Sequence, residues 1–482
     1  MTKNLKNKAI NGTLWSALDN ILNKGVAFIV GIILANLLTP AEYGLIAIIM
    51  LFIAVFNSLV DSGFSSALIR KNNVTELDYN TIFLFNLAIS IVLFIVLYLI
   101  SPFISQFFRQ PELTLLTRVM GVIVIINALA IIQRTKLVKS IDFRIQTKIS
   151  VVSSVISGGI GITMAFLDFG VWSLVGQQIS RQLLNSSLLW FYNRWCPKLE
   201  FSKRSFQEMF SFGWRLMVSG LIDTIWKEIY QIVIGRFYSS ATLGQYGRAQ
   251  QFNTIFSSNL TQIIQRVSFP VLSSIQDDPK KLKEAYRKII KTTMYVSFIC
   301  MLILAAIAKP LILVLIGEKW LQSVEFLQII CFSGMMYPLH AINLNMLQVQ
   351  GRSDLFLRLE IFKKIIALIP VLLGIFISIY WMLIGSVFSG FCAYYLNSYY
   401  SGKLINYSIR EQIIDIYPSF LIAIAVSSVL YLISFADLGM IYILIIQLLV
   451  GIILTICFSM VSRNQEFTTL KTILLSVINR NK

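Results

Sequence analysis

Long apolar segments recur along this chain from beginning to end, and short polar segments separate them. Each apolar segment is about 20 residues long, which is the length an α-helix needs to cross the hydrocarbon core of a bilayer. Turn signals such as Pro40, Pro102 and Pro310 stand between segments. The pattern predicts fourteen transmembrane helices, at residues 12–37, 43–66, 80–101, 113–133, 148–167, 171–192, 210–236, 244–272, 289–308, 321–347, 359–379, 381–400, 413–433 and 439–461.

The composition agrees with a membrane protein that has no separate soluble domain. Of the 482 residues, 56% are hydrophobic and 13% are charged, and the mean hydropathy is +0.74. A soluble domain carries about 25% charged residues. No polar segment between the apolar ones is long enough to fold by itself. We therefore expect an all-α polytopic membrane protein.

Lysine and arginine, which give the chain a net charge of +18, are distributed unevenly between the predicted loops. Of the 41 basic residues, 30 fall on one side of the predicted membrane and eight within the spans, while the other side has only Arg109, Lys309 and Lys319. The positive-inside rule makes the basic side cytoplasmic, so we expect both termini in the cytoplasm. Basic loops beside an anionic leaflet also explain the net charge without a nucleic-acid partner.

The two halves of the chain repeat each other. Asp19 recurs as Asp223, 204 positions later, and Tyr43-Gly44 as Tyr246-Gly247, 203 positions later; three further matches follow in order at offsets from 208 to 212. The offsets predict two parallel six-helix repeats that form two lobes, with two more helices after them. The expected domains are an N-terminal lobe at 1–200, a C-terminal lobe at 201–405, and two helices with a cytoplasmic tail at 406–482. Parallel repeats are typical of transporters with a site between the lobes.

Polar residues within the spans mark a candidate binding cavity, because a charge at the bilayer centre costs about 2.5–3.5 kcal/mol on insertion scales. In the predicted helix at 244–272, polar residues fall on one face of a helical wheel. Asp223 and Lys227 are four residues apart and can pair along their helix, so structural pairing stays an alternative role for charges of this kind. The candidate cavity residues are Asp19, Lys24, Asp61, Arg215, Asp223, Lys227, Gln250, Thr254, Ser257, Thr261, Gln265 and Arg266, with Arg181 as a weaker candidate.

The sequence lacks the signatures of the enzyme classes it could be confused with. Gly402-Lys403 is followed by Leu404, so the phosphate-binding loop of an ATP-driven pump is absent. The five cysteines have no metal-ligand spacing, and the single histidine, His340, is interpreted as a packing residue. We therefore expect no catalytic residue, no metal site and no cofactor. Coupling to a proton, to sodium or to no ion stays open.

Three segments resemble a known family: "ANLLTPAEYGLIAI" at 35–48, "DSGFSSALIRK" at 61–71 and "FPVLSSIQDDPKKLKEAYRK" at 269–288. They are similar to the polysaccharide transporter branch of the multidrug/oligosaccharidyl-lipid/polysaccharide exporter superfamily, which contains the Wzx-type flippases. The resemblance implies two lobes that open a cavity to either side of the bacterial inner membrane in turn.

The resemblance also implies a cargo and partners. The cargo would be an undecaprenyl-diphosphate-linked oligosaccharide repeat unit, moved to the periplasmic leaflet for the biosynthesis of a surface polysaccharide such as lipopolysaccharide O-antigen or exopolysaccharide. The implied partners are membrane lipids, a polysaccharide polymerase and chain-length proteins. A multidrug exporter of the same superfamily shares the architecture and stays an alternative. A membrane-embedded polysaccharide polymerase or ligase is the competing enzyme class, although the loops on the outer side are short and nearly uncharged.

Overall fold

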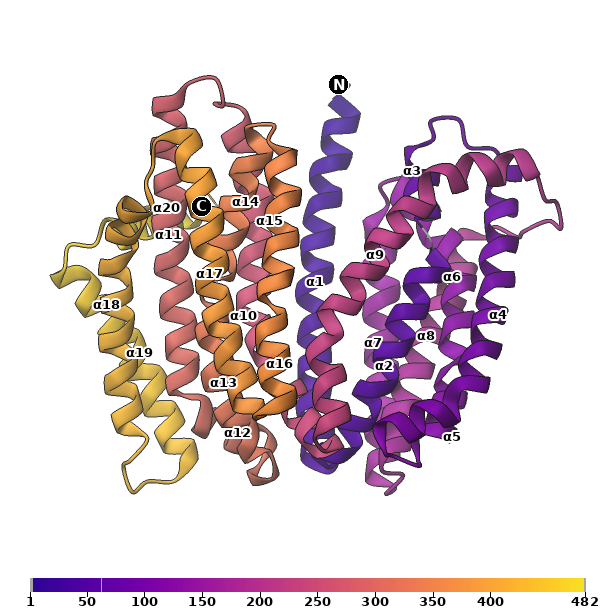
Figure 1. The fold of residues 1–482 in the computed structure, drawn as a ribbon, viewed down its shortest axis with the longest axis horizontal. Helices are drawn as coiled ribbons and strands as arrows, with labels where there is room; N and C mark the ends of the chain where they lie inside the picture. Colours follow the sequence, from indigo (N-terminus) through magenta and orange to yellow (C-terminus); the bar gives the residue numbers. More distant parts are fainter. Residues whose placement is uncertain (1–2, 62, 481–482) are drawn as a thin grey trace. The chain divides into compact units, whose positions relative to one another are not determined.

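The computed structural model describes residues 3–61 and 63–480, and every regular element in those residues is a helix (Figure 1). The chain divides into two compact units, Met1–Gly244 and Gln245–Lys482, here called the N-terminal unit and the C-terminal unit. The helices are α1 (Lys3–Leu37), α2 (Pro40–Asp61), α3 (Phe64–Arg70), α4 (Glu76–Phe108), α5 (Leu113–Met120), α6 (Val122–Lys139), α7 (Phe143–Phe166), α8 (Val171–Asn193), α9 (Lys203–Phe237), α10 (Ser240–Ser273), α11 (Pro279–Ala306), α12 (Ala308–Ile316), a 3₁₀ turn (Glu318–Trp320), α13 (Leu321–Gly334), α14 (Tyr337–Val349), α15 (Ser353–Ile366), α16 (Leu368–Phe376), α17 (Ile379–Ile405), α18 (Ile409–Ile433), α19 (Met440–Val461) and α20 (Gln465–Arg480).

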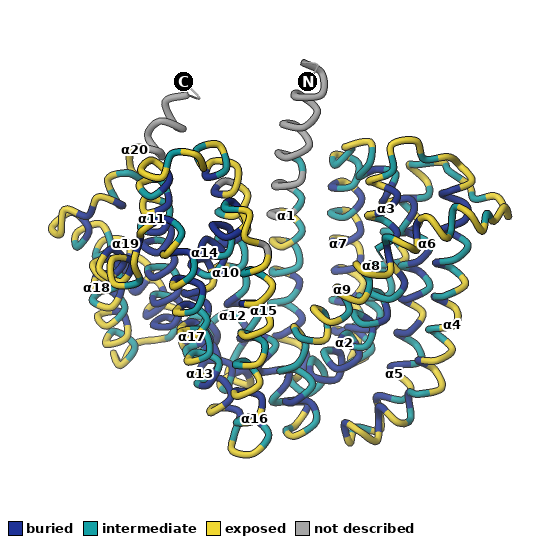
Figure 2. Tube along the Cα trace, turned by 45° about the horizontal axis from the view of Figure 1, so that its top comes forward, coloured by how far each residue is buried: buried dark blue, intermediate teal, exposed yellow. Residues whose placement is uncertain are grey.

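The helices account for all the apolar segments. Eight helical segments in the described part of the chain are long and apolar enough to cross a membrane. Four of the fourteen expected spans each consist of two consecutive helices, which are α2 with α3, α5 with α6, α13 with α14, and α15 with α16. Long apolar residues remain exposed along α4 and α19, including Leu99, Phe103 and Ile452, and Figure 2 colours exposed stretches of the trace along α4. Because such faces are stable only in lipid, the chain is a multi-pass membrane protein, as the hydropathy pattern predicts.

Side-chain caps fix where several helices begin. At the start of α4, Thr75 accepts from the backbone of Asp78, and Asp78 accepts from the backbone of Thr75. Ser408 and Glu411 form the same reciprocal capping box at the start of α18. These pairs satisfy backbone N–H groups that have no partner within the helix. The polar residues between the apolar segments therefore set the helix boundaries.

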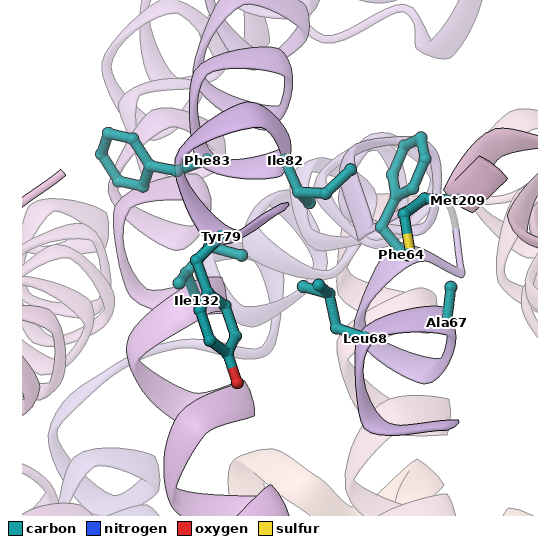
Figure 3. Packing of buried hydrophobic residues seen from close by; sticks show 8 residues of the cluster. All are labelled: Phe64, Ala67, Leu68, Tyr79, Ile82, Phe83, Ile132 and Met209. Atoms are coloured by element: carbon teal, nitrogen blue, oxygen red, sulfur yellow. The ribbon is translucent and has the colours of Figure 1, made fainter. Parts of the chain in front are cut away.

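The N-terminal unit is built around two sets of packed helices. Helix α1 packs along α7, which packs along α8, while α4 packs against α6. A buried apolar cluster joins α3, α4, α6 and α9 (Figure 3). The cluster consists of Phe64, Ala67, Leu68, Tyr79, Ile82, Phe83, Ile132 and Met209. Burial of these side chains is the main force that holds α3 in place, because the helix itself has only seven residues.

Helix α9 belongs to the N-terminal unit, although the predicted repeat would place it in the second half of the sequence. It contacts α2, α3 and α4, and Figure 1 shows it beside α3. Gly63, which has a φ of 70°, separates α2 from α3, and an added Cβ at this residue would lie 2.7 Å from the carbonyl oxygen of Gly213 in α9. The glycine therefore permits both the left-handed backbone and the close approach of α9.

The segment between α8 and α9 is attached to the N-terminal unit by hydrogen bonds. Gln133 donates to the carbonyl of Trp195, and the Trp195 indole donates to Glu76 Oε2 at 2.6 Å. Further along, the backbone N–H of Lys198 donates to Asn80, and that of Ser202 donates to Thr81. These bonds fix the connection to α4 and α6, so the start of α9 is held against the unit.

A close backbone approach joins the starts of α2 and α10 within the N-terminal unit. An added Cβ at Gly44 would lie 1.8 Å from the carbonyl oxygen of Ser240, and one at Gly244 would lie 1.9 Å from that of Pro40. The two helix starts are 200 positions apart, as are the ends of α1 and α9. The predicted repeat, aligned by helix boundaries, would pair Gly44 with Gly244, three residues before the Gly247 that the sequence match pairs with it.

In the C-terminal unit, α11 packs along α18, α18 along α19, and α17 against α13, α14 and α16. Arg287 of α11 donates through Nε and Nη2 to both carboxylate oxygens of Asp415 on α18, and the Nη2 distance is 2.6 Å. The Tyr407 hydroxyl donates to the same carboxylate at 2.7 Å. This bidentate pair attaches the last two apolar helices to the rest of the unit.

Candidate functional site

A polar cavity of about 410 Å³ lies inside the N-terminal unit, among α1, α2, α6, α7 and α8. A second cavity of about 340 Å³ shares Asn57, Asn127 and Arg134 with it. We call the two together the polar groove. Its polar lining residues are Asp19, Asn23, Asn57, Asp61, Ser65, Asn127, Arg134, Thr135, Gln146, Ser150, Gln178, Arg181, Gln182 and Asn185. So many polar side chains among membrane-spanning helices indicate a binding site.

One wall of the groove is a hydrogen-bonded network between α1 and α7. Asn23 Nδ2 donates to Asp19 Oδ1 at 2.7 Å, and Ser150 Oγ donates to the same oxygen at 2.5 Å. One turn along, Ser154 Oγ donates to Asn23 Oδ1 at 3.0 Å. Two neutral donors thus fix the position of the Asp19 carboxylate in this wall.

Two guanidinium groups, from α6 and α8, also line the groove. On α8, the residues Gln178, Arg181, Gln182 and Asn185 follow one another at helical spacing and share one face. Arg134 of α6 is exposed to the groove, and its Nη2 donates to Asn185 Oδ1 at 3.3 Å. The larger cavity by itself has two arginines and one carboxylate in its lining, a net positive charge, and the smaller cavity adds the Asp61 carboxylate.

Several amide groups of the groove have unused hydrogen-bonding capacity. Asn57 Oδ1, Gln146 Oε1 and Gln182 Nε2 are buried atoms that meet no hydrogen-bond partner among the residues that the structure describes. Leaving such atoms unsatisfied costs about 1–3 kcal/mol each. They offer two acceptors and one donor to whatever fills the groove. The arrangement suits a ligand that combines negative charge with hydroxyl groups.

The structure brings only part of the expected cavity residues to this groove. Asp19 and Arg181 line the larger cavity, and Asp61, whose carboxylate accepts from Ser65, lines the smaller one. Lys24 is exposed on α1 and is not a lining residue of either cavity.

The three expected residues of α9 lie on its exposed surface instead. Asp223 and Lys227 form the predicted ion pair at 2.7 Å, with exposed side-chain fractions of 53% and 70%. The Arg215 guanidinium lies 5.8 Å from the ring centre of its neighbour Trp214. None of the three lines the polar groove.

The polar stripe expected at 244–272 lies on α10 in the C-terminal unit. Ser257 and Thr261 are buried, and their hydroxyls donate to backbone carbonyls of their own helix, as does Thr254. Gln250 is half-buried, whereas Gln265 and Arg266 are exposed. The hydroxyl protons of the stripe are therefore used within α10.

Arg134 lines the groove although it is not among the residues expected there. It lies one residue beyond the predicted span at 113–133, whereas α6 continues to Lys139 and carries Arg134 within the helix. Charged residues end a hydropathy window without ending a helix. The face of α8 from Gln178 to Asn185 was also missed, although its spacing of three and four residues is visible in the sequence.

Known proteins resemble this chain in both sequence and fold. Residues 33–325 match the family described as "Polysaccharide biosynthesis protein". The chain is 27% identical over 348 residues to the teichuronic acid biosynthesis protein TuaB of Bacillus subtilis (strain 168), which covers 72% of each protein. It is 24% identical over 377 residues to the lipopolysaccharide biosynthesis protein WzxC of Escherichia coli (strain K12), with 77% of this chain and 76% of that protein covered.

Among solved structures, the fold is similar to that of the lipid II flippase MurJ in an inward closed conformation. The TM-score is 0.74 at 16% sequence identity, with 94% of this chain and 99% of the flippase covered. At this identity the likeness concerns the arrangement of helices. The polar groove and its lining residues are features of this chain's own sequence.

Proposed function

The chain belongs to the polysaccharide biosynthesis protein family, and from that premise we propose that it is a flippase for a lipid-linked oligosaccharide. The cargo would be an undecaprenyl-diphosphate-linked repeat unit, moved across the bacterial inner membrane by alternating access for surface polysaccharide biosynthesis. Similarity to WzxC, whose name assigns it to lipopolysaccharide biosynthesis, and the fold shared with a lipid II flippase support the proposal. Transport of this kind needs no catalytic residue and no cofactor.

The observation that carries the proposal is the chemistry of the polar groove. A diphosphate needs cations, and sugars need neutral donors and acceptors. Arg134 and Arg181 supply fork-shaped donors suited to phosphate oxygens. Asn57, Gln146 and Gln182 supply unused acceptors and a donor for hydroxyl groups. We propose that the headgroup of the cargo enters this groove while its lipid chain stays in the bilayer.

The proposal includes the parallel repeat and the orientation of the chain. Helix starts recur at offsets that grow along the sequence: 200 from α2 to α10, 203 from α4 to α11 and 210 from α7 to α15. Growing offsets are what small insertions in a second copy of six helices would produce. The basic ends of the units would face the cytoplasm together with both termini.

The proposal is tested with the purified full-length protein in liposomes that contain a fluorescent undecaprenyl-diphosphate oligosaccharide. The fraction of label that an outside reagent can reach reports movement between leaflets. We expect transport by the wild type, and a reduction of roughly tenfold or more in Arg134→Gln and Arg181→Gln, since charge-assisted hydrogen bonds are worth about 1.5–3 kcal/mol.

Two controls accompany these variants. Arg181→Lys should retain more activity than Arg181→Gln, because lysine keeps the charge but loses the fork. Arg215→Gln changes an exposed arginine outside the groove and should transport like the wild type. No movement of the labelled lipid by well-folded wild-type protein would overturn the proposal.

A multidrug exporter of the same fold is the alternative that the pocket chemistry disfavours. Lipophilic cationic drugs would meet the two arginines of the larger cavity, which carries a net positive charge. Deleting the gene should therefore leave drug susceptibility unchanged while lipid-linked repeat units accumulate on the cytoplasmic leaflet. Single repeat units that reached the periplasm without being joined would instead indicate a polymerase.

A further inference from the structure

A third cavity, which has two cations in its lining, lies at the turn between α17 and α18 in the C-terminal unit. Its volume is about 560 Å³. The lining residues are Ser398, Tyr399, Gly402, Lys403, Asn406, Ser408, Ile409 and Arg410. It is separate from the polar groove, all of which lies in the N-terminal unit.

The two cations of this cavity are not neutralised by carboxylates. The Lys403 ammonium donates to the Tyr399 hydroxyl at 2.6 Å and lies 4.2 Å from the centre of its ring, both neutral interactions. Arg410 is exposed at the cavity. Within residues 3–61 and 63–480, neither cation forms an ion pair. The nearby Glu411 is occupied by Lys283 and by the cap of α18.

The turn itself has a geometry that keeps the cavity in place. An added Cβ at Gly402 would lie 2.4 Å from the carbonyl oxygen of Tyr407, so the end of α17 and the start of α18 meet backbone to backbone. Lys283 of α11 donates to the carbonyl of Asn406, which ends α17 in a left-handed conformation. Lys403 and Arg410 are therefore presented from a turn that is fixed on both sides.

An exposed aromatic face of α17 runs from this cavity along the helix. Phe388, Phe391, Tyr395 and Tyr399 have exposed fractions of 66%, 41%, 57% and 39%, and their spacing places them on one side of the helix. The rings of Tyr395 and Tyr399 are stacked, with centres 6.4 Å apart and planes at 17°. From Phe388 to Tyr399 the rise is about 17 Å, close to the thickness of one leaflet of the hydrocarbon core, which is about 15 Å.

An apolar face as long as one leaflet, ending at two unpaired cations, matches the shape and charge of a lipid phosphate. We propose that Lys403 and Arg410 bind the diphosphate of a polyprenyl lipid, whose chain lies along the aromatic face of α17. The inference rests on the proposed function, because it makes this cavity a loading site for the same cargo. Two cations suit a diphosphate better than a phosphodiester, which carries a single negative charge.

The test measures binding of radiolabelled undecaprenyl diphosphate, without sugar, to the full-length protein in detergent micelles. Arg410→Gln and Lys403→Gln should each weaken binding roughly tenfold, since each removes one charged contact to phosphate. Arg358→Gln and Lys280→Gln are matched controls: both residues are exposed cations of the C-terminal unit outside the cavity, and their variants should bind within twofold of wild type.

Competing ligands separate the possible sources of the phosphate. Unlabelled undecaprenyl diphosphate should displace the probe, whereas phosphatidylglycerol and inorganic diphosphate should need at least about tenfold higher concentrations. Equal competition by phosphatidylglycerol would make the cavity a site for bulk anionic lipid and overturn the proposal. Equal competition by inorganic diphosphate would refute a role for the aromatic face, as would unchanged probe binding in a Phe388→Ser, Tyr395→Ser double variant.

Transport measurements keep this site distinct from the proposed function. In the liposome assay, Arg410→Gln should raise the cargo concentration needed for half-maximal rate and leave the maximal rate near that of wild type. Variants that bind and transport like wild type would refute the site while the flippase proposal stands. A wild-type protein that binds undecaprenyl diphosphate through Lys403 and Arg410 but moves no lipid-linked oligosaccharide would refute the flippase proposal alone.

Discussion

Alanine at Gly44 should destabilise the protein strongly, because the starts of α2 and α10 meet there without room for a side chain. A Cβ at Gly44 would lie 1.8 Å from the oxygen and 2.5 Å from the carbon of the Ser240 carbonyl, and real Cβ atoms essentially never come within 3.0 Å of another heavy atom. The two helix starts would have to separate by about 1.2 Å. The Ser240 carbonyl belongs to the backbone, so no change of side-chain rotamer can move it away from the added Cβ.

The expected size follows from two opposing contributions. Overpacking costs about 1–3 kcal/mol, and a rigid backbone neighbour places Gly44→Ala at the upper end. The higher helix propensity of alanine returns about 1 kcal/mol. The net loss of about 2 kcal/mol corresponds to a decrease of roughly 4–8 °C in the unfolding temperature of a unit of this size. Gly244→Ala, which meets the Pro40 carbonyl at 1.9 Å, should behave in the same way.

The assay heats the purified proteins in detergent and follows the fraction that remains monodisperse on size-exclusion chromatography. Gly247→Ala is the matched control, because it lies in the same helix as Gly244 and an added Cβ there would meet nothing within 4 Å. Its unfolding temperature should equal or exceed that of the wild type. If alanine at positions 44, 244 and 247 had equal effects, the close approach of α2 and α10 would be refuted.

Three further predictions concern ion pairs and orientation. Asp415→Asn should lower the unfolding temperature by several degrees, because it removes the charge that Arg287 binds at both oxygens. Asp354→Asn, in an exposed ion pair, should leave the unfolding temperature unchanged. Equal effects of the two variants would refute the prediction for Asp415. Lys227→Ala should alter the unfolding temperature by less than about 2 °C, since its pair with Asp223 is exposed; a larger decrease would show that the pair is structural. Single cysteines at positions 168 and 437 should react with an impermeant reagent from the periplasm, and those at 139 and 284 from the cytoplasm; labelling of 139 and 437 from the same side would exclude the fourteen-span topology.

Hydropathy could predict where the helices lie, because the length of an apolar run is written directly in the sequence. It did not predict the breaks within four of the expected spans. At Gly63 the break is tied to the approach of Gly213, which is 150 positions away in the chain. Between α15 and α16 the break comes just before Pro370, which has no N–H to offer the Ile366 carbonyl, so a local signal was present there. Which glycines and prolines break a helix depends on tertiary contacts that a local pattern does not contain.

The candidate site could be predicted in part for a related reason. The sequence shows that Asp19 and Lys24 share a helix, but their directions differ: Asp19 accepts bonds from α1 and α7 within the groove, whereas Lys24 is exposed. Only the packing of α1 against α7 decides which of the two faces the groove. The polar face of α8 could have been found, since four polar residues at helical spacing are a stronger signal than a single charge.

The packing of α9 on the N-terminal unit has a consequence for the order of synthesis. Residues up to Asn193 complete eight helices, yet the cluster around Phe64 and Leu68 lacks the cover of Met209 until α9 has been made. A chain released at residue 200 would leave these apolar side chains without their partner, whereas one released at 244 would contain the whole first unit. The ribosome must therefore translate some 40 residues of what the repeat counts as the second half before the first half can finish folding.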